Sequence, residues 1–413
     1  MCVQGELDIY LEKINLLNYR NYPFLELELA PGMLLLEGRN GQGKSNLLES
    51  LYLLAIGKSL RNSADRELVF RDAEANALSQ VSATLRRGNN IVDIQVNLQR
   101  MERNKYDTSQ QLNELDVPAV HKIVRVNGVS RSTSGLVGEV IAVMFSAEDL
   151  DLITRSPSVR RKYLDILISQ VDQKYLEHLR HYQKVIKQRN HLLKLVRGGR
   201  SDSGELEFWD DELSISGAYI VVKRNEILAV LSGKADLIYG NLAEKRENLE
   251  LIFRPDVPEI LIETNSYSEI FKDVMMRSRQ EDVASGVTNR GPHRDDIQMI
   301  LGGRDVSIYA SRGQCRTVAL SMRLSEAEYL REVSSHTPIL LLDDVLSEMD
   351  SRHRSNILDV AYQYDQCIVT TADSQMVDHS HLSKMTRYLV DAGHVTTQNM
   401  NLKEEIKDGR EDL

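Results

Sequence analysis

The sequence predicts an α/β fold in which a mixed sheet surrounds one phosphate-binding helix, with a mainly helical lobe inserted into the chain. Three observations support this prediction. A short apolar run at residues 33–36 leads into a glycine-rich loop, and apolar residues then recur at helical spacing over 46–54. A second apolar run, 338–342, ends in two aspartates. Between these two strands, helical periodicity dominates from about residue 158 to 279.

The composition sets broad limits on function. The 413 residues are 42% hydrophobic and 27% charged, as expected for an ordinary globular protein of two or three domains. The net charge of −10 does not indicate nucleic-acid binding, so any basic surface must be local. Because no run of 18 apolar residues and no secretory signal is found, no membrane association is expected. Three cysteines without metal-ligand spacing indicate a reducing, cytoplasmic location: Cys2, Cys315 and Cys367.

The first third of the chain is expected to be rich in strands. Residues 24–29 alternate apolar and polar side chains, which is typical of a half-buried strand. The polar and aromatic segment before it, residues 18–22, either lies beside a purine or only connects two strands. Two alternating runs, 80–85 and 91–98, are joined by a Gly-Asn-Asn turn and predict a hairpin. Further strands are expected at 122–129 and 140–145.

The glycine-rich loop matches the phosphate-binding pattern G-x-x-x-x-G-K-[ST]. Its glycines permit a tight turn that brings backbone N–H groups against phosphate oxygens, and the next helix directs its positive end at the same anion. Lys44 is expected to hold the β- and γ-phosphates, and the Ser45 hydroxyl is expected to reach Mg²⁺. The expected nucleotide contacts are Gly38, Arg39, Asn40, Gly41, Gln42, Gly43, Lys44, Ser45 and Asn46.

The strand at 338–342 supplies the second half of this chemistry. It ends in Asp343, expected to hold the magnesium shell, and Asp344, expected to orient or deprotonate the attacking water. Upstream, a Ser-Arg-Gly-Gln turn at 311–314 precedes a helical run and predicts a second anion-binding helix end. A Ser-x-x-Asp turn at 347–350 and a strand at 366–373 follow.

This order of motifs is that of an ABC-type ATPase head. In such heads the Ser-x-Gly-Gln helix of one copy completes the nucleotide site of a second, so ATP should join two copies of the chain. The expected contacts in trans are Ser311, Gly313 and Gln314.

The two halves of the nucleotide motif are far apart in the sequence. Lys44 and Asp343 are separated by 299 positions, more than a compact head needs. We therefore expect residues 158–279 to form an inserted helical lobe between two head segments, 9–157 and 280–400.

A basic run lies inside the expected lobe. Residues 172–200 contain eight lysines and arginines against two acids, a net charge of +6. Such a run either contacts the DNA backbone or is a solvated helix face. Arg61, in a basic turn, is likewise a candidate contact for DNA or phosphate or a structural ion-pair partner. His293 and Arg294 lie in a turn that is expected to tie the lobe to the ATPase sheet.

Several separate stretches resemble the RecF family, the bacterial recombination and repair ATPases related to SMC heads. The resemblance covers nearly the whole chain from about Tyr10, and residues 1–8 precede the usual family start. Departures are Cys315, where members usually carry a second Gln, Met349 for Leu and Ala147 for Pro. The resembling stretches are residues 17–22, the phosphate-binding loop, 148–150, 156–157, 160–165, 291–296, 309–314 and 342–350.

The resemblance implies an ATP-dependent homodimer that binds DNA, as gapped duplex and single strands, and helps RecO and RecR to load RecA. It implies slow, DNA-stimulated ATP hydrolysis with Mg²⁺, and it implies that Glu148 senses the magnesium. Cys315 is expected to weaken hydrolysis that depends on the dimer. A nucleotide-gated clamp with little turnover is the alternative. A P-loop nuclease is disfavoured because only about 60 residues follow Asp350, and a transporter ATPase is disfavoured by the large insertion.

Overall fold

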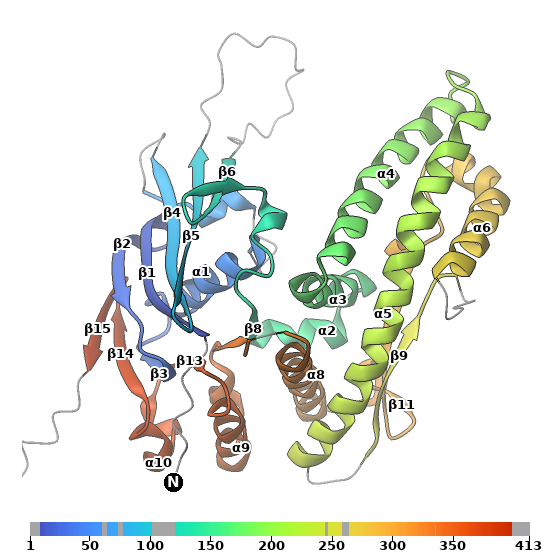
Figure 1. Ribbon diagram of the computed structural model, residues 1–413. Helices are drawn as coiled ribbons and strands as arrows, with labels where there is room; N and C mark the ends of the chain where they lie inside the picture. The colour runs from blue at the N-terminus through green and yellow to red at the C-terminus, as the bar shows by residue number, and fades with distance from the viewer. Residues whose placement is uncertain are drawn as a thin grey trace, which may run out of the picture. The chain divides into compact units, whose positions relative to one another are not determined.

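The computed structural model describes residues 9–59, 64–72, 77–100, 120–243, 247–257, 264–334 and 336–398. These residues form two compact units (Figure 1). The first unit combines the chain up to residue 146 with the chain from 336 onward, and the second spans 147–335. Arg61 lies outside the described residues. In the part of the chain that is described, no helix has the length and apolar character needed to cross a membrane.

The first unit contains a six-stranded mixed sheet in the order β15-β14-β3-β13-β12-β8. All neighbours are parallel except β15, which pairs antiparallel with β14. The inner strands are buried on both faces, which explains their continuous apolar runs. The strands are β3 (Gly32–Glu37), β8 (Ala142–Phe145), β12 (Ile339–Leu342), β13 (Gln366–Thr371), β14 (Thr386–Asp391) and β15 (His394–Gln398).

A second, antiparallel sheet of the first unit has the order β2-β1-β4-β5-β6-β7. Between the two sheets lies α1 (Lys44–Ile56), which contacts β4 and β5 of one sheet and β8 and β13 of the other (Figure 1). The predicted mixed sheet around a P-loop helix is therefore confirmed. The strands are β1 (Ile9–Tyr19), β2 (Tyr22–Glu28), β4 (Leu78–Arg87), β5 (Asn90–Arg100), β6 (Val120–Val126) and β7 (Val129–Arg131).

Short helices complete the first unit. The helix α9 (Ser351–Ala361) begins after Asp350, whose carboxylate accepts a hydrogen bond from the His353 N–H, as a capping residue should. The others are α10 (His379–Leu382) and the 3₁₀ turns Asp65–Leu68, Thr133–Gly135, Val345–Glu348 and Ser374–Met376.

The second unit is mainly helical and carries a small antiparallel sheet, β11-β10-β9. The long helices α4, α5 and α6 pack side by side (Figure 1). The helices are α2 (Asp151–Thr154), α3 (Pro157–Val171), α4 (Gln173–Arg197), α5 (Leu206–Leu242), α6 (Thr264–Ser285), α7 (Val306–Tyr309) and α8 (Arg312–Val333). The strands are β9 (Leu249–Arg254), β10 (Asp296–Leu301) and β11 (Arg304–Asp305), and 3₁₀ turns span Ala147–Leu150, Ser203–Glu205 and Pro292–Arg294.

This unit is larger than the predicted insertion. It includes 158–279 but also residues 147–157 and 280–335. The reason is packing, because β9 lies inside the predicted insertion and pairs with β10 outside it, while α5 packs on α8. The division into head segments and insertion stays a prediction.

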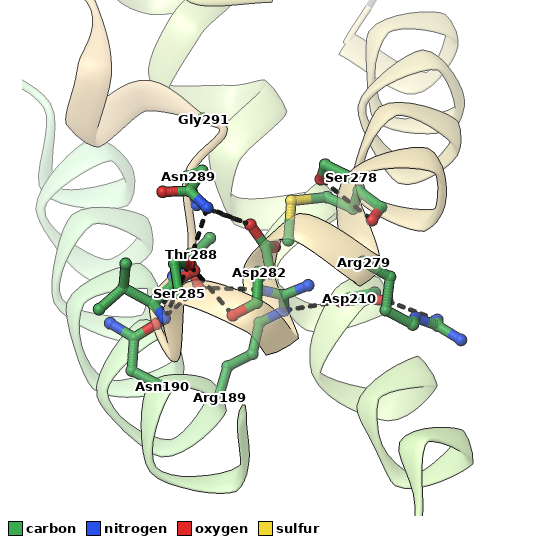
Figure 2. Close-up of polar contacts among 12 residues, drawn as sticks. Arg189, Asn190, Asp210, Ser278, Arg279, Asp282, Ser285, Thr288, Asn289 and Gly291 are labelled. Carbon is green, nitrogen blue, oxygen red and sulfur yellow. Dashed lines mark hydrogen bonds and ion pairs between the residues drawn. The ribbon is translucent and has the colours of Figure 1, made fainter. Parts of the chain in front are cut away.

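A buried ion network holds α4, α5 and α6 together (Figure 2). Arg189 is fully buried and donates from Nε to Asp210 Oδ1 and from Nη1 to Asp282 Oδ2, both at 2.7 Å. Thr288 Oγ1 accepts a third bond at 2.9 Å, and Arg279 Nη2 pairs with the other Asp210 oxygen at 2.6 Å. Arg189 is therefore a structural cation, and its charge must be subtracted from the basic run considered for DNA contact.

The turn at 291–296 is a second polar anchor. Tyr182 Oη lies 2.8 Å from His293 Nδ1, and His293 Nε2 lies 3.0 Å from the Thr288 carbonyl oxygen. Arg224 on α5 pairs with Asp295 at 2.8 Å. The sequence predicts that this turn ties the lobe to the ATPase sheet. The contacts instead join α4 and α5 to the start of β10, within the second unit.

Candidate nucleotide site

The phosphate-binding loop occupies residues 38–43, between β3 and α1, as its pattern predicts. Two of its glycines are required by close packing. A Cβ atom on Gly38 would lie 2.2 Å from the Val390 carbonyl oxygen. One on Gly43, where φ is 116°, would lie 2.5 Å from Asn21 Nδ2. Only glycine lets the backbone approach its neighbours this closely and adopt this conformation. No atom lies within 4 Å of the position that a Cβ on Gly41 would take, although its φ is 82°, and Arg39 and Asn40 are exposed in the same loop.

Lys44 begins α1 and is largely buried. Its Nζ donates to the carbonyl oxygens of Gly38, at 2.5 Å, and Arg39, at 3.0 Å. Burial lowers the pKa of Lys44, while the nearby carboxylates of Asp344 and Asp343 act in the opposite direction. The ammonium is thus held by neutral acceptors of its own loop, and phosphate oxygens can take the place of these acceptors.

Hydroxyl and carboxylate oxygens converge from α1, β12 and β13. Ser45 Oγ donates to Asp343 Oδ1 at 2.8 Å, although the two residues are 298 positions apart. Thr370 Oγ1 donates to the same oxygen at 2.9 Å and accepts from the Asp344 N–H at 2.9 Å. Thr370 was not predicted as a site residue, because its position after an apolar run carries no motif.

The donors in this cluster fit Mg²⁺, a hard cation that prefers oxygen ligands and keeps several waters. Ser45 and Asp343 would supply two oxygens, and phosphate and water the remainder. Among the described residues, no group of three or more His, Cys, Asp or Glu side chains could hold a metal ion.

Asp344 has an unusual backbone. Its φ is 53°, in the left-handed region that non-glycine residues seldom adopt, and it begins the 3₁₀ turn Val345–Glu348. Such conformations are enriched at functional sites. The residue directly after Asp343 is therefore turned out of the strand conformation at the point where the predicted catalytic carboxylate stands.

The segment at 18–22 packs beneath the phosphate-binding loop. Tyr19 and Tyr22 are fully buried, and Tyr22 Oη donates to the Gly43 carbonyl oxygen at 2.9 Å. Asn21 Nδ2 donates to the Gln42 carbonyl at 3.2 Å and Asn21 Oδ1 accepts from Asn46 Nδ2 at 2.8 Å. The segment connects β1 to β2, as one of the two alternatives predicts, and the buried rings of Tyr19 and Tyr22 offer no free face to a purine. Through its hydrogen bonds to Gln42, Gly43 and Asn46, the segment also supports the phosphate-binding loop.

A second support comes from the far end of the chain. In the turn between β14 and β15, the Ala392 N–H donates to Gln42 Oε1 at 2.6 Å, and the Gly393 N–H donates to the Gln42 carbonyl oxygen at 3.1 Å. Gln42 and Ala392 are 350 positions apart. No local sequence signal indicates this contact.

The Ser-x-Gly-Gln turn belongs to the second unit and begins α8. Ser311 Oγ accepts from the Gln314 N–H at 3.2 Å, and Gln314 Oε1 accepts from the Ser311 N–H at 2.9 Å. This reciprocal pair is a capping box. Ser311, Arg312 and Gly313 are exposed. The predicted helix cap is confirmed, and the exposed turn leaves the first N–H groups of α8 available to an anion.

Two other expected residues lie in the second unit. Cys315 is buried, which raises the pKa of its thiol, and its Sγ is 3.9 Å from the Ala310 carbonyl oxygen. Glu148 is exposed in the turn Ala147–Leu150. The neighbouring Asp149 is buried and pairs with Arg323 at 2.8 Å. The magnesium-sensing role of Glu148 stays a prediction.

Comparison with known proteins extends over almost the whole chain. The family model described as RecF/RecN/SMC N terminal domain matches residues 10–396. DNA replication and repair protein RecF of Roseiflexus castenholzii is 34% identical over 398 residues, covering 94% of this chain and 99% of that protein. The protein of the same name from Bacillus mycoides is 35% identical over 390 residues, covering 94% and 98%.

Comparison with solved structures indicates the same family. A structure of the recombination mediator protein RecF with ATP, from the RecFOR pathway, superposes with a TM-score of 0.84 at 32% identity and covers 97% of this chain and 100% of that one. A Pyrococcus furiosus Smc head, with a TM-score of 0.51, 15% identity and coverage of 94% and 96%, shares the fold alone. The chain therefore belongs to the RecF family of DNA replication and repair proteins and has the fold of an SMC-like ATPase head.

Proposed function

We propose that this chain binds and slowly hydrolyses ATP with Mg²⁺, and that ATP joins two copies of it on DNA during recombinational repair. The observation that carries the proposal is the contact of Ser45 with Asp343, beside Lys44. It brings the two halves of the nucleotide motif together. The solved RecF relative with ATP supports the choice of nucleotide.

The residues have separate tasks in this proposal. The loop N–H groups and Lys44 bind the phosphates, and Lys44 exchanges its carbonyl acceptors for phosphate oxygens. Ser45 and Asp343 hold Mg²⁺, which would neutralise charge on the phosphates. Asp344 orients the attacking water and accepts its proton. The exposed turn at 311–313 of a second copy contacts the γ-phosphate and completes the site.

Turnover and binding can be separated with one substitution. Asp344→Asn should lower the rate of ATP hydrolysis at least a hundredfold, because it removes the group that accepts the proton of the water. ATP affinity, measured by calorimetry, should change less than threefold. If the chain is instead a nucleotide-gated clamp, the wild type should hydrolyse almost no ATP, whether or not gapped duplex is present. Asp344→Asn should then cause no further loss of hydrolysis.

A basic stripe on α4 is the proposed DNA contact. It comprises Arg180, Lys184, Lys187, His191 and Lys194, which are all exposed and follow one another by four, three, four and three positions. That spacing places them on one face of a helix. Lys and Arg along such a stripe can neutralise successive phosphates of gapped duplex or single-stranded DNA. We further propose RecO and RecR as partners, since the structure with ATP is of a RecF in the RecFOR pathway.

A further inference from the structure

The amide of Gln314 has a partner beyond the capping box. Gln314 Nε2 donates to Glu247 Oε2 at 3.0 Å, while Gln314 Oε1 accepts from the Ser311 N–H at 2.9 Å. Glu247 follows α5 and precedes β9, 67 positions away from Gln314. Both ends of the Gln314 amide are therefore hydrogen-bonded.

The chemistry of the carboxylate fixes the direction of this amide. An ionised carboxylate can only accept hydrogen bonds, so Glu247 can bind only the NH₂ end of Gln314. The carbonyl end must then face the Ser311 N–H, which is the orientation that the capping box requires. A neutral neighbour would also tolerate the reversed amide, which would place an NH₂ group against the Ser311 N–H and break the cap.

Two other segments of the second unit lie close to Glu247. Gly302, in the turn between β10 and β11, donates its N–H to the Asn248 carbonyl oxygen at 3.0 Å. A Cβ atom on Gly302 would lie 3.6 Å from Glu247 Oε1. The Glu247 charge also adds to the burial of Tyr239 in raising the pKa of that tyrosine, so the carboxylate lies near the end of α5. The turn after β10 and the last part of α5 therefore both lie near the carboxylate.

We infer that Glu247 is a positioning residue for the ATP-dependent dimer: it orients Gln314 so that Ser311 and Gly313 are presented to nucleotide bound by the second copy. The inference rests on the proposed function, because only a partner's nucleotide gives the turn something to contact. Glu247 touches neither the nucleotide nor the reacting atoms. It acts through the shape of the helix cap.

The test measures the dimer dissociation constant by analytical ultracentrifugation, with saturating ATP and Mg²⁺, on the Asp344→Asn protein so that ATP persists. Adding Glu247→Ala should weaken the dimer roughly tenfold, since a hydrogen bond to a charged group is lost from the cap. Glu247→Gln should weaken it less, because its carbonyl can still accept from Gln314. Glu250→Gln, which removes an exposed charge on β9, is the matched control and should have no effect.

Two further readouts separate positioning from structural damage. ATP affinity and the thermal unfolding midpoint followed by Trp209 fluorescence should match those of the parent protein. If the parent forms a dimer and the Glu247→Ala protein forms it equally well, the positioning role is wrong while the proposed function stands. If the parent stays monomeric with ATP and with ATP plus gapped duplex, the proposed function fails and the inference fails with it.

Discussion

Gly43 ties the nucleotide loop to the segment beneath it. Its φ is 116°, and a Cβ atom added there would approach Asn21 Nδ2 to 2.5 Å, so there is no room for a side chain. Gly43→Ala should therefore displace the loop and lower ATP affinity more than tenfold, measured by calorimetry. Gly88→Ala, in the turn between β4 and β5, is the matched control, since Gly88 also has positive φ but no neighbour within 4 Å, and its strain is only about 1 kcal/mol. Equal losses in both variants would contradict a packing role for Gly43.

His293 should make the stability of the second unit depend on pH. Burial lowers its pKa to about 4, and its contacts with Thr288 and Tyr182 suit the neutral ring. The unfolded chain takes up this proton near pH 6.5, so the stabilisation is present above 6.5 and is lost as pH falls toward 4. Relative to His293→Gln, the wild type should lose about 3 kcal/mol between pH 7 and pH 4.

Urea unfolding followed by Trp209 fluorescence is a direct check of this effect, because the chain has one tryptophan and it lies on α5. The difference between the two proteins, rather than either curve alone, isolates the histidine from the other titrating groups. A difference that stays constant from pH 7 to pH 4 would show that His293 keeps an ordinary pKa.

The candidate site residues that belong to a motif were easier to predict than the residues that hold them in place. Lys44, Ser45 and Asp343 belong to short patterns whose spacing reflects a ligand, and the structure brings them together. Thr370 and Glu247 belong to no pattern. Their contacts connect positions that only the folded chain brings together, so the sequence contains no local signal for them.

Among the helices, α4 shows two uses of positive charge. Arg189 is fully buried between Asp210 and Asp282, whereas Lys187, two positions earlier, is exposed. Arg189→Met should lower the free energy of unfolding of the second unit by about 3–5 kcal/mol, because two buried carboxylates lose their shared cation. Lys187→Met should change it by less than about 0.5 kcal/mol. Urea unfolding followed by Trp209 fluorescence measures the change for both variants. A small loss of unfolding free energy for Arg189→Met would refute the structural role of the network.

The exposed stripe of the same helix should control DNA affinity through salt. Replacing Lys184, Lys187 and Lys194 by Gln should reduce the slope of log affinity against log salt by about two to three for gapped duplex, since each lost phosphate contact contributes about 0.9. A control removes three lysines elsewhere in the second unit that are paired with carboxylates: Lys223, Lys234 and Lys272. An unchanged slope in the first variant would exclude α4 as the DNA contact.

Elements with strong periodicity were predicted well, and elements that depend on distant partners were not. The hairpin β4–β5, the strand β12 and the helix α8 follow their apolar spacing. The pair β14–β15 and the helix α9 were not anticipated, because their runs are short and mixed in polarity. The second unit extends beyond the predicted insertion because β9 pairs with β10, which begins 47 residues later. The bounds of the insertion itself stay a prediction.

At the scale of the whole molecule, the motifs of the proposed nucleotide site are divided between two units. The phosphate-binding loop and Asp343 belong to the first, and the Ser-x-Gly-Gln turn belongs to the second. In the proposed mechanism, the turn acts on nucleotide held by another copy of the chain. The bound nucleotide would therefore determine whether the chain is a monomer or a dimer. This link is the central claim of the proposed mechanism.

The most direct test is the mass of the Asp344→Asn protein in solution, measured by light scattering with ATP and Mg²⁺ and again with ADP and Mg²⁺. We expect a dimer of about 94 kDa with ATP, twice the 47.0 kDa of one chain, and a monomer with ADP. The measurement is repeated with gapped duplex, in case DNA is needed to close the dimer. A monomer with ATP under both conditions would contradict the link between nucleotide and assembly.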